Sequence, residues 1–162
     1  MRSNEIGLVI LTLLLVIVLS SGCMGNNTDD DKITTPTPVP AAVDLHKNGF
    51  DAYIKGNYTE ALDFYNQSVA ADPTYARAWM DRGLVLIKLN RTYEAVSSYD
   101  FALALDNKFA IVWNDRGEAL MALGNYTAAS ESFDKALEIA PEYAAAKENK
   151  NLVMKKMSEG DI

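Results

Sequence analysis

Apolar and small residues in this chain follow a helical pattern that repeats along the sequence. They recur at spacings of three and four positions, in pairs of runs of about 13 residues each. The pairs recur with a period of about 34 residues, which is the separation of Trp79 and Trp113. The same period relates three other sets, namely Gly49, Gly83 and Gly117; Ala61, Ala95 and Ala129; and Tyr65, Tyr99 and Phe133. One unit of this length cannot bury its apolar face alone, so the pattern predicts a stack of helical repeats.

The unit that begins at position 110 shows the pattern most clearly. Its two apolar stripes are Trp113, Gly117, Leu120 and Leu123, and then Ala129, Phe133, Ala136 and Leu137. Gly124-Asn125-Tyr126 lies between them and is typical of a tight turn between antiparallel helices. Thr59 and Thr127 are predicted to cap the second helices of their units. Pro73 and Pro141 are predicted to open the next first helices, where a missing N–H does no harm.

Period and pattern together resemble the tetratricopeptide repeat (TPR) family. The resemblance covers three consecutive units, residues 42–75, 76–109 and 110–143, and predicts a capping helix and tail over 144–162. It implies an all-α fold, a right-handed superhelical stack of three helix-turn-helix units plus the C-terminal capping helix. Gly117, Ala129 and Ala136 are small, as in the family, where small residues let the two helices approach closely. The second unit departs from the family pattern, with Asn90 in place of the turn glycine and Asn107 in place of the closing proline.

The N-terminus predicts export. Residues 6–19 form an apolar run that is shorter than the roughly 20 residues needed to span a bilayer. Arg2 precedes the run, and small residues follow it and lead to Cys23, the only cysteine. This order of a charged head, an apolar run and small residues is typical of a signal peptide, here over residues 1–22. Leu19-Ser20-Ser21-Gly22-Cys23 resembles the lipobox of prokaryotic lipoprotein signals, which implies a lipid on Cys23, although Ser20 stands where that family favours leucine. An uncleaved anchor and cleavage by an ordinary signal peptidase stay open as alternatives.

Residues 23–41 are rich in aspartate, threonine and proline, so they are predicted to form a flexible tether. The lipid implied at Cys23 would make this tether lipid-anchored. The predicted location is therefore the extracytoplasmic face of the cell membrane. Asn-x-Ser/Thr sequons occur at Asn26, Asn57, Asn66, Asn90 and Asn125. Asn26 and Asn90 are the preferred candidates for N-glycosylation in a host that carries out this modification.

The TPR resemblance also implies a binding groove, because the first helix of each unit lines the concave face in that family. It places twelve side chains there: His46, Phe50, Tyr53, Arg77, Met80, Asp81, Leu84, Lys88, Asn114, Asp115, Glu118 and Met121. Aromatic residues and methionines with charged borders suit an extended or helical peptide, with basic groups toward the first unit and acidic groups in the third. A competing interpretation packs the apolar members between helices and pairs Asp81 and Asp115 with nearby arginines such as Arg77.

Several classes of function are excluded by the residue types present. His46 is the only histidine, and no second histidine or free cysteine could join it at a metal or in catalysis. The chain has no Gly-rich phosphate loop and no His-Glu-x-x-His helix, so it is predicted to be no enzyme and to hold no cofactor or metal. A net charge of −7 without a basic stripe argues against nucleic acid as a partner.

One specialised TPR function is also excluded. TPR domains that grip the carboxylate end of chaperone tails use lysines, asparagines and an arginine. The corresponding places here hold His46, Phe50, Asp81, Ile111 and Asp115. Two of these are acidic and repel a carboxylate.

The predicted function is a membrane-tethered extracytoplasmic scaffold that binds a peptide segment of another envelope protein in its concave groove. Two alternatives stay open. One is a receptor for an envelope glycan or a small ligand, and the other is a self-associating structural lipoprotein.

Overall fold

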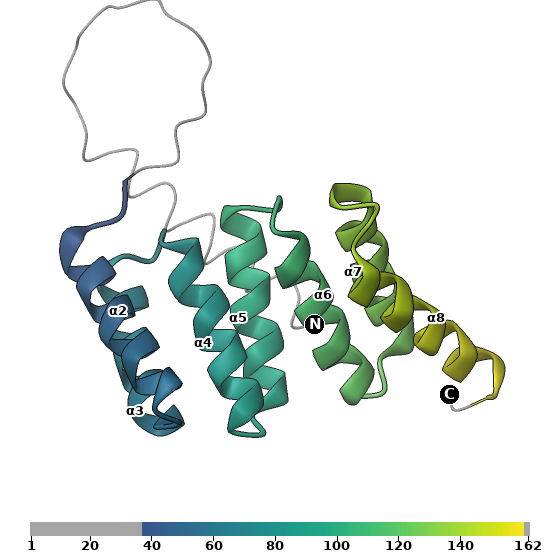
Figure 1. Cartoon of the computed structure of the whole chain (residues 1–162), viewed down its shortest axis with the longest axis horizontal. Helices are drawn as coiled ribbons and strands as arrows, with labels where there is room; N and C mark the ends of the chain where they lie inside the picture. Colours follow the sequence, from purple (N-terminus) through teal and green to yellow (C-terminus); the bar gives the residue numbers. More distant parts are fainter. Residues whose placement is uncertain (1–36, 161–162) are drawn as a thin grey trace, which may run out of the picture. The chain divides into compact units, whose positions relative to one another are not determined.

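A computed structural model describes residues 37–160, and this part of the chain is all α-helical (Figure 1). Its seven helices are α2 (Pro40–Ile54), α3 (Tyr58–Ala71), α4 (Ala76–Lys88), α5 (Thr92–Leu105), α6 (Ala110–Ala122), α7 (Tyr126–Ile139) and α8 (Ala144–Ser158). The helices pack in the pairs α2–α3, α4–α5 and α6–α7, and α8 follows α7 at the end of the stack. The predicted all-α stack of helix-turn-helix units is confirmed.

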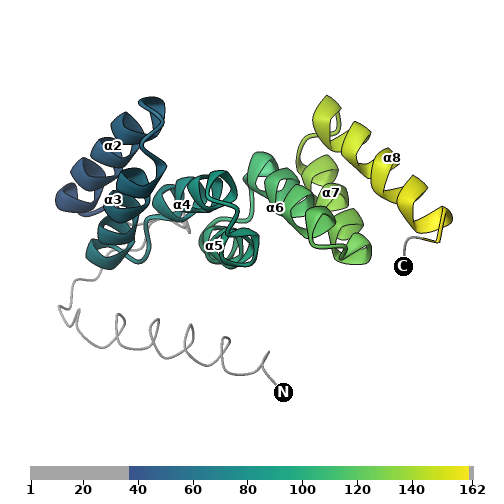
Figure 2. The ribbon, with the colours of Figure 1, turned by 90° about the horizontal axis from the view of Figure 1, so that it is seen from below.

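The first and second helices of the units form two rows (Figure 2). The first helices are α2, α4, α6 and α8, and each contacts the next one in the row. Among residues 37–160, no Cα atom of one second helix lies within 8 Å of a Cα atom of another second helix. Because elements on the inner side of a curved stack approach each other more closely, the first helices line the inner side. We call this surface the first-helix face, and it carries His46, Phe50, Arg77, Met80, Asp81 and Ile111.

Each helix pair is closed by the same contact between a glycine and an aromatic ring. The three contacts join Gly49 to Tyr65, Gly83 to Tyr99, and Gly117 to Phe133. An added Cβ on these glycines would lie 2.7, 2.5 and 2.5 Å from the nearest ring carbon, which is inside the van der Waals limit. The three rings are almost completely buried. The 34-residue period of the sequence therefore reflects a packing contact that recurs in each unit. This agrees with the expectation that small residues let the two helices of a unit approach closely.

The contacts between successive units also repeat. A cationic side chain of one first helix reaches back 16 residues to the preceding second helix, in the pairs Arg82–Asn66, Arg116–Asp100 and Lys150–Asp134. The indole N–H groups of Trp79 and Trp113 donate to the carbonyls of Pro73 and Asn107, at 2.9 Å in both units. These polar contacts recur at fixed positions, so they belong to the construction of the stack.

The turns within the units depend on residues that accept a positive φ. Gly56 and Gly124 have φ of 79° and 77°, and Asn90 has φ of 58° at the place where the second unit lacks the glycine. Asparagine tolerates this left-handed conformation better than most residues, which explains the substitution in the second unit.

The predicted helix caps Thr59 and Thr127 are wrong. The second helices begin earlier, with Asn57 and Asn125 at the N-cap, and the Asn125 side chain accepts a hydrogen bond from the Ala128 N–H at 3.3 Å. The turn ends directly at these asparagines, because the preceding glycine already has a positive φ. The threonines therefore lie inside the first turn of each helix.

The predicted positions of the prolines need a correction as well. Pro73 and Pro141 lie in tight turns closed by hydrogen bonds from Tyr75 N to the Asp72 carbonyl and from Tyr143 N to the Ala140 carbonyl. The helices that follow begin only at Ala76 and Ala144. Proline suits the second position of such a turn because its ring already holds φ at the value that the turn requires.

The boundary of the predicted tether also differs. α2 begins at Pro40, so the last two residues of the range 23–41 are helical. Proline at the first helical position has the required φ and lacks only an N–H that would be unpaired there. In addition, the Val39 N–H donates to the Asp72 carboxylate at 3.0 Å, which fixes the start of α2 to the end of α3.

The predicted signal peptide, the lipidation residue Cys23 and the sequon at Asn26 lie outside the described residues, and they stay predictions. Between positions 37 and 160, no helix is long and apolar enough to cross a bilayer.

Candidate functional site

The first-helix face contains a hollow of about 500 Å³ that reaches across three units. It is lined by His46 and Phe50 from α2, Arg77, Met80 and Asp81 from α4, and Phe109 and Ile111 at the start of α6. Five of the predicted groove residues therefore meet at one place. Most of the lining is apolar, and the charged groups are Arg77 and the His46–Asp81 pair.

The floor of the hollow is held by a polar contact between two units. His46 Nε2 lies 2.7 Å from Asp81 Oδ2, and both side chains are mostly buried. The imidazole ring also lies between two aromatic rings, with centroid distances of 5.5 Å to Tyr65 and 5.3 Å to Tyr75. Burial and the nearby Asp81 carboxylate raise the pKa of Tyr65, which stays neutral. The pairing of Asp81 with an arginine, which the competing interpretation expected, is thus replaced by a pairing with His46.

The walls of the hollow carry large apolar side chains that face solvent. Phe50 is 48% exposed and Ile111 is 53% exposed. The core beside them is well packed, and Tyr65 in it is 1% exposed. Phe50 and Ile111 differ from the other exposed apolar residues because they line one hollow together. The packing explanation for Phe50 is therefore wrong, since this ring is not enclosed between helices.

Two lining residues were absent from the predicted groove. Ile111 occupies the helix position that Arg77 has in the preceding unit, so the repeat register alone could have found it. Phe109 lies in the turn before α6. The contribution of Phe109 could not be predicted from the helical pattern, because the direction of a side chain in a turn does not follow the helical period.

A second group of predicted residues forms a polar cluster on α6. Asn114 is almost fully buried, and its Nδ2 donates to Glu118 Oε1 at 2.8 Å. Asn149 on α8 donates to Asn114 Oδ1 at 3.0 Å and to Glu118 Oε1 at 2.7 Å. Within residues 37–160, the hydrogen bond that Asp115 receives is a long one, of 3.4 Å, from Asn114 Nδ2. We call Asn114, Asp115, Glu118 and Asn149 the α6 acidic cluster.

Burial dominates the electrostatics of the α6 acidic cluster. It raises the pKa of Asp115 to about 6, with a smaller contribution from the Glu118 charge, and the Asn114 hydrogen bond opposes the shift. Burial also raises the pKa of Tyr143, with Asp115 and Glu118 adding to the effect. No cation lies within ion-pair distance of either carboxylate among residues 37–160. The expected pairing of Asp115 with an arginine is therefore not present in this part of the chain.

The remaining predicted groove residues line neither the hollow nor the cluster. Tyr53 packs against Tyr58 with ring centroids 5.6 Å apart, and Met121 packs against the core around Phe133. Leu84 is half-buried, and Lys88 is at the end of α4. The competing interpretation thus describes Tyr53 and Met121 correctly.

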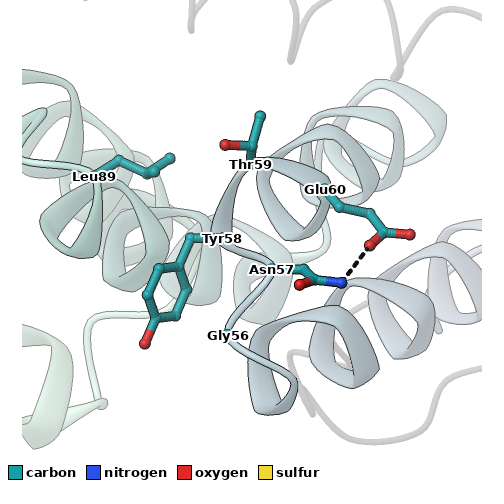
Figure 3. A pocket seen from close by; sticks show the side chains of 6 residues that line it. All are labelled: Gly56, Asn57, Tyr58, Thr59, Glu60 and Leu89. Atoms are coloured by element: carbon teal, nitrogen blue, oxygen red, sulfur yellow. Dashed lines mark hydrogen bonds between the residues drawn. The ribbon is translucent and has the colours of Figure 1, made fainter.

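A separate hollow of about 390 Å³ lies at the turn between α2 and α3 (Figure 3). It is lined by residues 56–60 and by Leu89 from the next unit, and Asn57 Nδ2 donates to Glu60 Oε2 at 3.0 Å at the start of α3. Its polar groups serve the turn and the start of α3. The sequon residue Asn90 follows Leu89. Its glycosylation stays a prediction.

Among the described residues, no group of three or more histidine, cysteine, aspartate or glutamate side chains could hold a metal ion. The side chains brought together on the first-helix face are apolar anchors, amides and carboxylates, together with Arg77 and His46. They can bind a chain segment, and they contain no paired nucleophile and base.

Two profiles of the tetratricopeptide repeat family match this sequence, at residues 76–109 and at residues 110–143. The chain therefore contains tetratricopeptide repeats. The pair α2–α3, which precedes these ranges, has the same glycine–aromatic contact as the two matched units.

Solved TPR domains share the fold. The first TPR domain of Spaghetti (RPAP3), bound to an HSP90 peptide, has a TM-score of 0.71 at 24% identity and covers 73% of this chain and 94% of its own. The TPR domain of Sgt2 from Aspergillus fumigatus has a TM-score of 0.71 at 22% identity, with 76% and 83% covered. The second TPR domain of human RPAP3, in complex with an HSP70 peptide, has a TM-score of 0.69 at 25% identity, with 72% and 97% covered.

Proposed function

We propose that this chain is a scaffold that binds a peptide segment of another protein on its first-helix face. The observation that carries the proposal is the hollow between α2, α4 and α6, whose walls expose Phe50 and Ile111 to solvent. Two of the solved TPR domains with this fold bind peptides. A non-catalytic binding role also agrees with the residue types on the face.

The hollow suits one large apolar side chain of a bound peptide. Such a side chain would remove water from Phe50, Met80, Phe109 and Ile111 together. Complete burial of a leucine-sized side chain contributes about 1.5–3 kcal/mol. Arg77 at the rim can donate hydrogen bonds to peptide carbonyl groups, which would fix the backbone beside the anchor.

The peptide should differ from the chaperone tails held by the two peptide-bound relatives. Asp81 and Asp115 stand on the first-helix face, and Asp81 already contacts His46. A C-terminal carboxylate placed among these groups would be repelled. We therefore propose an internal segment of the partner as the ligand.

The membrane tether is the finer part of the proposal. A lipid on Cys23 would hold the repeats at the extracytoplasmic face of the membrane, where the partner would be another envelope protein. Metabolic labelling of the whole chain with an alkyne-bearing fatty acid tests this part. We expect label on the wild type and none on Cys23→Ser, and equal labelling of the two proteins would exclude a lipid at this cysteine.

Site-specific photo-crosslinking in the native host tests the peptide-binding proposal. A benzophenone amino acid replaces Ile111 in one version and Ile139 in the other, since both isoleucines are exposed and Ile139 lies on the second helix α7. We expect position 111 to crosslink to one defined segment of a polypeptide and position 139 to give no such product. Equal products at the two positions would place binding elsewhere.

A further inference from the structure

The peptide-binding proposal leaves open which peptides the first-helix face selects, and its charges bear on this question. On this face Asp81 is paired with His46. Two carboxylates of the second helices are also paired, Asp100 with Arg116 and Asp134 with Lys150. Asp115 and Glu118 differ, because their hydrogen-bond partners within residues 37–160 are the side-chain amides of Asn114 and Asn149.

Asp115 is partly buried, whereas Glu118 is exposed. A partly buried carboxylate without a cation is unfavourable, because it has lost part of its hydration and the neighbouring carboxylate repels it. The titratable groups that face them from the neighbouring elements supply no positive charge. Glu118 acts on Asp115 along α6, and the hydroxyl groups of Tyr99 on α5 and Tyr143 before α8 lie in the field of both carboxylates. Asp81 on α4 also contributes negative potential at Tyr99. A cation bound here would relieve the repulsion.

The acidic pair lies in line with the hollow. Ile111, Asp115 and Glu118 are spaced by four and three residues on α6, so they share one stripe of the helix. With a rise of about 1.5 Å per residue, Asp115 lies about 6 Å and Glu118 about 10 Å along the axis from Ile111. An extended peptide advances about 3.3 Å per residue, so these distances correspond to two or three peptide positions.

We propose that the partner segment carries a lysine or arginine two or three positions from its apolar anchor. The anchor fills the hollow while the basic side chain lies against Asp115 and Glu118. This inference rests on the proposed function and narrows it to one chemistry of ligand. The ligand proposed for this face is basic, whereas the chaperone tails are acidic.

A defined peptide library tests the inference on the purified whole chain in detergent. The probe is a phage-displayed library of random twelve-residue peptides, selected at neutral pH against the immobilised protein. We expect the enriched sequences to combine a large apolar residue with lysine or arginine at the stated spacing. The affinity of the most enriched synthetic peptide is then measured by fluorescence anisotropy for the wild type and for three variants.

The variants distinguish the preference for a basic residue, proposed here, from the binding of a peptide in the hollow, proposed above. The double variant Asp115→Asn with Glu118→Gln keeps the side-chain shapes and should weaken binding about ten-fold or more, as the loss of a partly buried charge contact does. Glu131→Gln removes an exposed carboxylate from the second helix α7 and should leave the affinity unchanged. Ile111→Ser tests the hollow itself and should also weaken binding about ten-fold or more.

A pH series gives an independent readout. Affinity of the wild type should fall as the pH is lowered from 7 to 5, because Asp115 takes up a proton in this range. The double variant should lack this dependence.

Binding that requires Ile111 but shows neither basic residues nor sensitivity to the double variant would overturn this inference and keep the proposed function. Binding that none of the variants weakens, or a library from which nothing is enriched, would overturn both.

Discussion

The interior of the repeat stack and its first-helix face follow different rules along the same helices. Inside, one helix position holds Gly49, Gly83 and Gly117, and each glycine meets an aromatic ring. On the face, one helix position holds Phe50, Leu84 and Glu118, which share neither size nor charge. The interior therefore keeps the period of the sequence, whereas the face departs from it at nearly every position.

This difference separates the two roles of the sequence. A contact needed to join two helices is needed again in each unit, so its residues repeat. A contact with one external partner is made once, so its residues are free to differ from unit to unit. Departure from the internal period therefore marks positions that packing does not fix, and exposed positions of the second helices, such as Gln67 and Lys135, depart from it as well.

Removal of an aromatic ring from the interior should have the largest effect. Phe133→Ala leaves a cavity against Gly117, and we expect it to lower the free energy of unfolding by about 3–5 kcal/mol. Urea unfolding followed by circular dichroism measures the change. The exposed ring of Phe50 is the matched control, since Phe50→Ala should change the stability by less than about 1 kcal/mol. Equal losses would contradict the division between interior and face.

Addition of a methyl group at the same contact should have a smaller but clear effect. In Gly117→Ala the new Cβ would lie 2.5 Å from Phe133, and we expect a net loss of about 1–3 kcal/mol although alanine favours the helix. Combination with Phe133→Leu should recover part of the loss, because the smaller side chain leaves space for the methyl group. Additive losses in the double variant would show that the two residues are not coupled.

The α6 acidic cluster should lower stability at neutral pH. Because the pKa of Asp115 is about 6 in the folded protein and 3.8 ordinarily, the folded state holds more protons between these values. The contribution of Asp115 to the free energy of unfolding should therefore fall as the pH rises from about 4 to 6 and stay level above this range.

Asp115→Asn should remove this pH dependence and stabilise the protein by about 1–2 kcal/mol at pH 7 relative to the wild type. Urea unfolding at pH 4 to 8 measures both proteins. Parallel pH profiles would show that Asp115 is not desolvated. A loss of stability at Asp115 would agree with its proposed role in binding a partner.

The smallest predicted effect concerns the helix caps. Asn125→Ala should destabilise α7 by about 1 kcal/mol, because the Ala128 N–H loses its side-chain acceptor. Thr127→Ala should change the stability by about 0.5 kcal/mol or less, since no hydrogen bond of its side chain to the helix start is present in the described structure. A larger loss of stability in Thr127→Ala than in Asn125→Ala would restore the prediction that Thr127 is the helix cap.

The sequence predicted the interior well and the face only in part. The period located every helix pair and the recurring positions of the glycines and the aromatic rings, since each recurs three times in the chain. That each glycine meets a ring is a finding of the structure. The caps were placed too late because the turn is short. The first helices end with the C-cap residues Lys55 and Leu123, the turn glycine follows, and the next residue is already the asparagine N-cap of the second helix.

The face was harder to predict because its contacts are not repeated. The His46–Asp81 contact joins residues 35 positions apart on neighbouring first helices, and only the packing of α2 against α4 brings them together. Phe109 reaches the hollow from a turn, which no helical pattern reports. The roles of Cys23 and Asn26 concern residues outside the described part of the chain and stay predictions.

The central claim is that the hollow of the first-helix face binds a peptide while the periodic interior maintains the fold. Its most direct test is the matched pair Ile111→Ser and Ile139→Ser, measured for affinity to the crosslinked segment and for free energy of unfolding. We predict that Ile111→Ser weakens binding about ten-fold or more with a stability change below about 1 kcal/mol, and that Ile139→Ser leaves binding unchanged. Unchanged binding in Ile111→Ser, or equal loss in both variants, would contradict the claim.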